Sequence, residues 1–197
     1  MPGQKSLKSQ LRREIRCNRA AIEAAQREHW NAAINQHLDK YSRQANPAVV
    51  AAYLAFDGEP DLMPTLAKLE ARGVRLALPV VQGAPGKSVI TFRHWSITGA
   101  MQQNRYGISE PAGTSDISVT DIDLALFPLV GWDKTGSRLG MGASFYDRLF
   151  QPFSELGRPV RMGVGYQLQY VKSIPSDPWD IRLHGVLTEN GWFTCKH

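Results

Sequence analysis

The sequence predicts an α/β fold, a single domain with helices on both faces of a mostly parallel, mixed sheet. Short apolar runs of strand length alternate with amphipathic segments of helical spacing along most of the chain. That alternation is typical of parallel sheets built from crossover units. The chain has 197 residues, a length that suits one domain with a substantial core. We therefore expect one domain spanning residues 1–197.

Two helices are expected before the first strand. Ser6 is a candidate N-cap for the first helix, which runs to about Arg19. Its core-facing stripe consists of apolar residues at helical spacing, Leu7, Leu11, Ile15 and Ile22. A row of cations borders this stripe, Lys8, Arg12, Arg16 and Arg19. Such a row is by default a solvated face, and we expect Arg16 and Arg19 to remain solvated. The second helix should end near Tyr41 and bury Trp30, Ile34, Leu38 and Tyr41.

Strands and helices then alternate to the end of the chain. A strand at 49–55, a helix capped by Asp61 and ended by Gly73, and a strand at 74–81 form a parallel crossover. Further along we expect strands at 89–95, 124–128 and 160–164, a loop-rich segment ending near 121, and a helix at 145–156. Near the C-terminus, Asn190-Gly191 predicts a hairpin with a tight primed turn.

Composition restricts the compartment and the partners. The two cysteines are far apart and lack CxxC or metal-ligand spacing, so we expect no disulfide framework and a reducing, cytoplasmic location. The apolar run at 49–56 is too short to cross a bilayer, and the basic N-terminus lacks the apolar stretch of a signal peptide. A net charge of +5 favours nucleic acid or small polyanions such as nucleotides as partners.

A glycine-rich segment at 136–148 carries most of the chemical information. It follows a predicted strand and opens a predicted helix, an arrangement whose backbone amides are suited to holding phosphate. The segment lacks the Gly-Lys-Ser/Thr of a Walker A loop and the spacing of a dinucleotide fingerprint. Glycines alone would equally suit a tight strand-to-helix connection, but Arg138 at its mouth and Asp147 in the first helical turn favour a phosphate site.

This segment resembles the signature of the 5-formyltetrahydrofolate cyclo-ligases, Gly-x-Arg-Leu-Gly-x-Gly-x-Gly-Tyr/Phe-Tyr-Asp. The matching residues are Gly136, Arg138, Leu139, Gly140, Gly142, Phe145, Tyr146 and Asp147. Three more segments resemble the same family in the same order, so the likeness spans nearly the whole chain. They are the N-terminal Lys8-Ser9-Gln10-Leu11-Arg12, the turn Leu54-Ala55-Phe56-Asp57-Gly58-Glu59-Pro60-Asp61, and the C-terminal Pro178-Trp179-Asp180 with Gly185-Val186-Leu187-Thr188-Glu189.

The resemblance implies a fold like that of the sugar-phosphate isomerases and CoA-transferases, and an ATP- and Mg²⁺-dependent closure of 5-formyltetrahydrofolate to 5,10-methenyltetrahydrofolate. Arg138 and Lys8 are the implied catalytic cations. The residues implied to bind ATP are Lys8, Arg12, Arg138, Leu139, Gly140, Met141, Gly142, Ala143, Ser144, Phe145 and Tyr146. Those implied to bind the folate are Leu54, Glu59, Met141, Phe145 and Tyr106. Asp147 and Asp180 are the implied Mg²⁺ ligands. The expected partners are therefore a reduced folate and ATP, with no nucleic acid and no membrane, and we expect a monomer.

General chemistry is consistent with these roles. Phosphoryl transfer demands positioning and charge neutralisation more than covalent help from the protein. Carboxylates are the hard ligands that Mg²⁺ prefers, and Glu59 could accept two parallel N–H bonds from a pterin edge. Each carboxylate also has a structural interpretation that spacing alone favours, because Asp147 suits a helix N-terminus, Asp180 a turn and Glu59 the start of a helix. The histidines show no ligand spacing.

Ala143 and Ser144 stand where the signature commonly has glycine at one or both positions. Ser144 lies three residues before Asp147, as in a capping box. We therefore expect Ser144 in the β region as an N-cap, with its hydroxyl accepting from a backbone amide, and we expect an active enzyme with a stiffer loop.

Two alternatives from other classes remain at this point. A phosphosugar isomerase or acyl-transfer enzyme on a similar sheet would need a catalytic carboxylate but no ATP. A basic nucleic-acid-binding protein would also carry excess positive charge, but the cations here are not interleaved with exposed aromatic residues.

Overall fold

The computed structural model describes residues 4–84, 87–105 and 107–196. The helices are α1 (Gln4–Ala20), α2 (Ala24–Ala45), α3 (Met63–Ala71) and α4 (Phe145–Phe150), with short 3₁₀ turns at Val119–Asp121, Gln151–Phe153 and Gln167–Gln169. The strands of the main sheet are β1 (Val49–Ala51), β2 (Arg75–Gln82), β3 (Val89–Trp95), β6 (Asp116–Ile117), β7 (Leu124–Pro128), β10 (Val160–Val164), β11 (Gly185–Thr188) and β12 (Gly191–Thr194). Two small hairpins pair β4 (Met101–Gln103) with β5 (Ser109–Pro111), and β8 (Gly131–Trp132) with β9 (Arg138–Leu139).

The main sheet is parallel at its centre and antiparallel at both edges. Its strand order is β12-β11-β10-β7-β1-β2-β3-β6. The pairs from β11 to β2 are parallel, whereas β12, β3 and β6 are added in antiparallel fashion. The predicted fold class, a mostly parallel mixed sheet with helices, is therefore confirmed.

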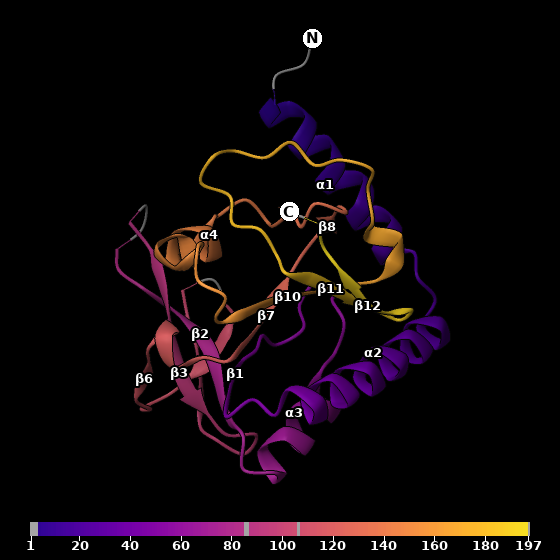
Figure 1. Ribbon diagram of the computed structural model, residues 1–197. Coiled ribbons are helices and arrows are strands. Elements are labelled where there is room, and N and C mark those ends of the chain that lie inside the picture. The colour runs from indigo at the N-terminus through magenta and orange to yellow at the C-terminus, as the bar shows by residue number, and fades with distance from the viewer. Residues whose placement is uncertain (1–3, 85–86, 106, 197) are drawn as a thin grey trace.

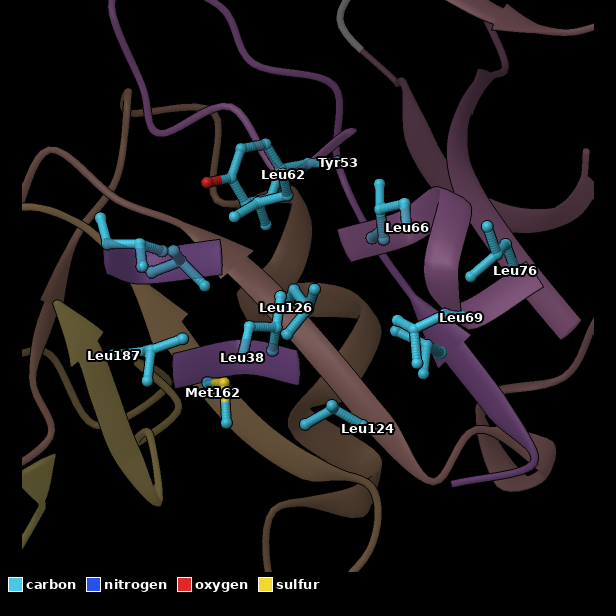
Figure 2. Close-up of a cluster of buried hydrophobic side chains, with 14 of the residues drawn as sticks. Leu38, Tyr53, Leu62, Leu66, Leu69, Leu76, Leu124, Leu126, Met162 and Leu187 are labelled. Carbon is cyan, nitrogen blue, oxygen red and sulfur yellow. The ribbon is translucent and has the colours of Figure 1, made fainter. Parts of the chain in front are cut away.

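Alternation along the strands gives the sheet two apolar faces. On one face, residues of β1, β2, β7 and β10 meet α2 and α3, and Figure 2 shows Leu38, Leu66 and Leu69 from the helices among Leu76, Leu124 and Met162 from the strands. On the other face, Val49, Ala51 and Phe127 pack with Phe150 of α4 and with the irregular segment that contains Ile181 and Leu183. Figure 1 shows α2 and α3 lying together on one side of the sheet and α4 apart from them. Helices therefore cover both faces, as predicted.

Several predicted boundaries are confirmed and have clear local causes. The strands at 89–95, 124–128 and 160–164 coincide with β3, β7 and β10. Gly73 follows α3 with φ 85°, and the N–H of Val74 reaches the carbonyl of Leu69 at 3.1 Å, which closes the helix end. At the start of the same helix the N-cap is Leu62 rather than the predicted Asp61, although Asp61 Oδ1 accepts from the N–H of Met63 at 2.9 Å.

The predictions for the two N-terminal helices are partly wrong. Residues from Gln4 onward are already helical, so Ser6 lies inside α1 rather than at its N-cap. Leu7 is 40% exposed because the first turns of α1 extend past the core, while Ile15 is buried. The second helix continues to Ala45, and Asn46 ends it in the left-handed region with φ 45°. Trp30 and Tyr41 are only partly buried, against the core.

The remaining differences concern lengths and turns. The first strand has three residues instead of seven. The helix at 145–156 is shorter than predicted because Pro152 lacks an amide hydrogen, and the chain passes into a 3₁₀ turn at Gln151. The C-terminal hairpin forms, but Thr188 pairs with Gly191, and the positive φ (110°) falls on Gly191 instead of Asn190. This fits a turn followed by a glycine bulge rather than the primed turn that Asn-Gly predicts.

The helices of the described residues include none that is both long and apolar enough to span a membrane.

Candidate active site

The site lies where the sheet reverses its winding. The chain leaves β1 through α3 to β2 on one side, and it leaves the neighbouring strand β7 through α4 to β10 on the other. Ligands of open α/β sheets bind at such a switch point, outside the carboxyl ends of the strands. A cleft of about 500 Å³ is found there. Its lining comes from α1, from the turn after β1, from the end of β7, from the glycine-rich loop, and from the segment before β11. The lining residues are Lys5, Lys8, Ser9, Arg12, Glu59, Pro128, Leu129, Val130, Arg138, Leu139, Gly140, Met141, Gly142, Ala143, Ser144, Phe145, Tyr146, Asp147, Asp177, Trp179 and Asp180.

The β8–β9 hairpin holds the start of the glycine-rich loop. Trp132 pairs with Arg138, and Gly131 pairs with the buried Leu139. Gly136 at the hairpin turn has φ 77°, and a Cβ there would lie 2.5 Å from the Leu183 carbonyl oxygen, so only glycine fits. The hairpin thus places the Arg138 side chain at the edge of the cleft before the loop opens into α4.

Ser144 adopts a conformation that contradicts the capping prediction. Its backbone lies in the left-handed region, with φ 49° and ψ 29°, and its side chain makes no capping hydrogen bond. An N-cap hydroxyl works from the β region, so Ser144 cannot act in that way here. The serine instead occupies a conformation that glycine adopts at lower cost. The spacing of Ser144 and Asp147 matches a capping box, but spacing carries no information about the φ of Ser144.

Arg138 and Asp147 form a close, largely buried ion pair. Arg138 Nη2 lies 2.6 Å from Asp147 Oδ1, and the two side chains are 6% and 14% exposed. The guanidinium also lies over the rings of Phe127 and Tyr146, at 5.1 and 5.4 Å from their centroids. Ring contacts and the ion pair together fix the direction of the cation. Arg138 therefore presents a preorganised positive charge beside the loop amides.

Helix α1 brings a second cationic group to the same cleft. Lys8 Nζ lies 2.8 Å from Asp177 Oδ2 and 3.0 Å from Asp180 Oδ2. Burial alone would lower the pKa of Lys8, but the hydrogen bonds and charges of both aspartates outweigh it and raise that pKa. Arg12 donates from Nε to the Gly140 carbonyl at 2.7 Å, which ties α1 to the loop. Figure 1 shows the orange-to-yellow segment that precedes β11 running beside α1.

Glu59 reaches the cleft from the turn after β1. Desolvation by burial raises its pKa from 4.5 to about 7, although its hydrogen bond from the Phe56 amide opposes the shift. Glu59 Oε2 accepts that hydrogen bond at 3.2 Å. A carboxylate tuned to this range and facing a cleft is a functional-site candidate.

The sequence-predicted folate contacts are only partly brought together. Met141 and Phe145 line the cleft, and Met141 is 50% exposed. Leu54 packs against the core beneath α2 and α3, and it is not among the lining residues. Tyr106 lies outside the described residues.

Comparison with known proteins is decisive for the family. One family model, that of the 5-formyltetrahydrofolate cyclo-ligases, matches residues 4–189. The chain belongs to the 5-formyltetrahydrofolate cyclo-ligase family. It is similar to the 5-formyltetrahydrofolate cyclo-ligase of Haemophilus influenzae, with 32% identity over 182 residues that cover 91% of this chain and 96% of the relative. The Escherichia coli enzyme of the same name is 31% identical over 176 residues, covering 88% and 96% of the two chains.

Solved structures of cyclo-ligase relatives have the same fold. The 5,10-methenyltetrahydrofolate synthetase of Aquifex aeolicus superposes with a TM-score of 0.82 at 27% identity, and the match covers 97% of this chain and 94% of that one. The synthetase of Mycoplasma pneumoniae superposes with a TM-score of 0.75 at 24% identity, covering 92% and 98%, and supports the fold alone.

Three features of this cyclo-ligase site were not predicted. Asp177 pairs with Lys8 although it precedes the Pro178-Trp179-Asp180 segment that the family resemblance singled out. Trp179, at 59% exposure, presents a large aromatic surface at the cleft. Arg19, predicted to be solvated, is completely buried. Its guanidinium donates to the Leu129 carbonyl and to Asp57 in the turn at 57–58. The sequence signal available for the first two was a tryptophan between two nearby aspartates, Asp177-Pro178-Trp179-Asp180.

The carboxylates of the site are compatible with a hard divalent cation. Asp147 uses Oδ1 for its hydrogen bonds and Asp180 uses Oδ2. The other oxygen of each accepts no hydrogen bond within the described part of the chain. Among the described residues, no group of three or more His, Cys, Asp or Glu side chains is placed to hold a metal ion. Such a site suits Mg²⁺, which is commonly held by one or two carboxylates, substrate phosphates and water.

Proposed function

We propose that this protein converts 5-formyltetrahydrofolate to 5,10-methenyltetrahydrofolate with consumption of ATP. One observation carries the proposal: a single cleft joins a cationic, glycine-rich end suited to phosphate with the carboxylate of Glu59 at the sheet edge. Family membership over residues 4–189 supports the reaction class. An isomerase or acyl-transfer enzyme on a similar sheet would not need ATP, so dependence on the nucleotide separates those reactions from this one.

The phosphate end would hold ATP. Lys8 and Arg138 supply positive charge, Arg12 holds the loop through Gly140, and loop amides at 140–144 supply donors. The γ-phosphoryl group passes to the formyl oxygen, giving ADP and an iminium phosphate. N10 then attacks the formyl carbon, loses its proton, and phosphate departs with the formyl oxygen, which leaves the methenyl bridge. Positioning and charge neutralisation supply the catalysis.

The folate end would be held by Glu59, Met141 and Phe145. The ionised Glu59 carboxylate can accept two parallel N–H bonds from the aminopyrimidinone edge of the pterin. Met141 and Phe145 supply apolar surface for the aromatic rings of the folate.

Asp147 and Asp180 would hold Mg²⁺ through their unused oxygens. A cation held there would supply positive charge against the phosphates. Arg138 forms an ion pair with Asp147, and Lys8 forms one with Asp180. Asp147→Asn should therefore raise the Mg²⁺ concentration needed for half-maximal rate more than it changes the KM for folate. An unchanged metal titration would return Asp147 to a structural role at the helix start.

The direct test of the function mixes pure protein with 5-formyltetrahydrofolate, ATP and Mg²⁺. Methenyl product should form only with nucleotide and metal present, with one ADP released for each methenyl group. Undiminished product without ATP would contradict the proposal.

We also expect a cytoplasmic monomer that does not bind nucleic acid. Steep, salt-dependent binding to duplex or single-stranded nucleic acid would contradict the last of these expectations.

A further inference from the structure

A second groove adjoins the cleft along the flank of α1. It has a volume of about 530 Å³ and shares Ser9, Arg12 and Met141 with the cleft. Because these residues line both spaces, a ligand longer than the cleft can continue into the groove past Met141. The groove also reaches Asp57, which belongs to the turn that carries Glu59.

The groove is rich in positive charge that its own acid does not neutralise. Arg12, Arg13 and Arg16 line it, and its acidic lining residue is Asp57. Asp57 is already held by Arg16 at 2.8 Å and by the buried Arg19 at 2.7 Å. Arg13 is exposed and forms no hydrogen bond or ion pair with any residue that the structure describes. The groove therefore offers free guanidinium donors to an anion.

The order of surfaces from cleft to groove is carboxylate, thioether, guanidinium. Glu59 lies in the cleft, Met141 at the junction, and Arg13 and Arg16 in the groove. A reduced folate has the matching order, with a pterin at one end, an aminobenzoyl ring in the middle, and a glutamate with two carboxylates at the other end. Thioethers pack well against aromatic rings, and arginines form charge-assisted pairs with carboxylates.

We propose that this groove binds the glutamate end of the folate substrate, with Arg13 and Arg16 pairing its carboxylates and Met141 packing against the aminobenzoyl ring. Arg16 donates to Asp57 from Nε and Nη2, so the Nη1 of Arg16 is left to donate to the ligand. The inference rests on the proposed function, since it assigns the tail of the same substrate. It makes Arg13 a binding residue, together with Arg16, which the sequence predicts to be solvated.

Cys17 offers a test that needs no turnover. It is exposed and lines the groove, whereas Cys195 is buried, and the sequence has two cysteines. Iodoacetamide should therefore alkylate Cys17 first, and peptide mass spectrometry gives its rate. Saturating 5-formyltetrahydrofolate should slow the reaction severalfold. The pteroate analogue, which lacks the glutamate, should leave the alkylation rate of Cys17 nearly unchanged. Equilibrium dialysis under the same conditions should show that the analogue is bound. Equal protection by both ligands, or protection by neither while both are bound, would overturn the inference.

A charge-matched pair of variants tests the same contact kinetically. Arg13→Gln should raise the KM for 5-formyltetrahydrofolate by about five- to tenfold, the scale of one exposed charge-assisted contact. Both kcat and the KM for ATP should stay unchanged, and the KM for the pteroate analogue should not respond. Lys68→Gln removes the same charge from the exposed surface of α3 and should change nothing.

The outcomes separate this inference from the proposed function. An equal rise in KM for the analogue, or an equal effect of Lys68→Gln, would overturn it in favour of diffuse electrostatics. An absence of methenyl product from either folate would instead contradict the proposed function, and Cys17 protection would still decide what the groove binds.

Discussion

Arg19 forms an ion pair with Asp57 from inside the protein. Its side chain is completely buried, and its Nη2 donates to Asp57 Oδ2 at 2.7 Å while its Nη1 donates to the Leu129 carbonyl at 3.2 Å. Asp57 has φ 52°, an uncommon conformation for a residue other than glycine. Arg27 adds a bond to the Gly58 carbonyl at 2.8 Å. The end of α1 and the start of α2 thus fix the turn from which Glu59 enters the cleft.

Removal of Arg19 should be costly for stability. Arg19→Ala leaves Asp57 without its buried partner and opens a cavity, so we expect a loss of about 2–4 kcal/mol in the free energy of unfolding. Urea unfolding at pH 7 measures it. Arg43→Ala is the control, because Arg43 is 61% exposed in its pair with Asp39 and should cost less than about 1 kcal/mol. Equal, small losses would mean that Arg19 is effectively solvated, as its place in the helical row predicts.

Ser144 should behave as a strained residue rather than a cap. Because its hydroxyl makes no capping bond, Ser144→Ala should change the free energy of unfolding by less than about 0.5 kcal/mol. Ser144→Gly should raise it by up to about 1 kcal/mol, since glycine adopts positive φ without the steric cost. Paired thermal melts decide the order. A loss of about 1 kcal/mol or more on Ser144→Ala, with little change on Ser144→Gly, would restore the cap.

Glu59 should make folate binding depend on pH near neutrality. Its pKa of about 7 means that the carboxylate ionises as pH rises from about 6 to 8, and only the ionised form accepts two N–H bonds. The KM for folate should therefore fall across this range, and Glu59→Gln should remove the dependence. A wild-type KM that rises with pH, or a dependence unchanged in the variant, would exclude Glu59 as the acceptor for the pterin edge.

The same group should act on stability in the opposite direction. The folded-state pKa lies above the ordinary glutamate value of 4.5, so the folded protein holds this proton more tightly than the unfolded chain. The contribution of Glu59 to stability is therefore largest at low pH and is lost as pH rises towards 7. Relative to wild type, the Tm of Glu59→Gln should be higher at pH 8 than at pH 5.

Lys8 and Arg138 should be needed for ATP use. We expect Lys8→Ala and Arg138→Ala each to lower kcat/KM for ATP by about ten- to a thousandfold, because each removes one of the charge-assisted phosphate contacts that we propose. Steady-state kinetics with varied ATP measures the effect. Lys40→Ala, on the exposed surface of α2, is the control. Losses no larger than that of the control would mean that the cleft does not hold the phosphates.

The sequence predicts those parts of the fold that depend on local pattern. The strands β3, β7 and β10 are bounded apolar runs, and Gly73 marks a helix end, so their limits follow from neighbouring residues. The segments resembling the cyclo-ligases also lead to residues that line one cleft, including Lys8, Glu59, Arg138 and Asp180.

Features that depend on distant contacts escaped prediction. Helical spacing places Arg19 among solvated cations, yet the turn at Asp57 and the Leu129 carbonyl, 38 and 110 positions away, bury it. The φ of Ser144 is set by the path of the loop between β9 and α4 rather than by its own neighbours. Asp177 acquires significance only because α1 brings Lys8 beside it.

The fate of the formyl oxygen tests the account most directly. The protein is given 5-formyltetrahydrofolate labelled with ¹⁸O in the formyl group, together with ATP and Mg²⁺, and the released phosphate is analysed by mass spectrometry. If the γ-phosphoryl group is transferred to that oxygen, each methenyl group formed should yield one phosphate carrying one ¹⁸O atom. Unlabelled phosphate accompanying normal methenyl formation would contradict phosphoryl transfer to the formyl oxygen.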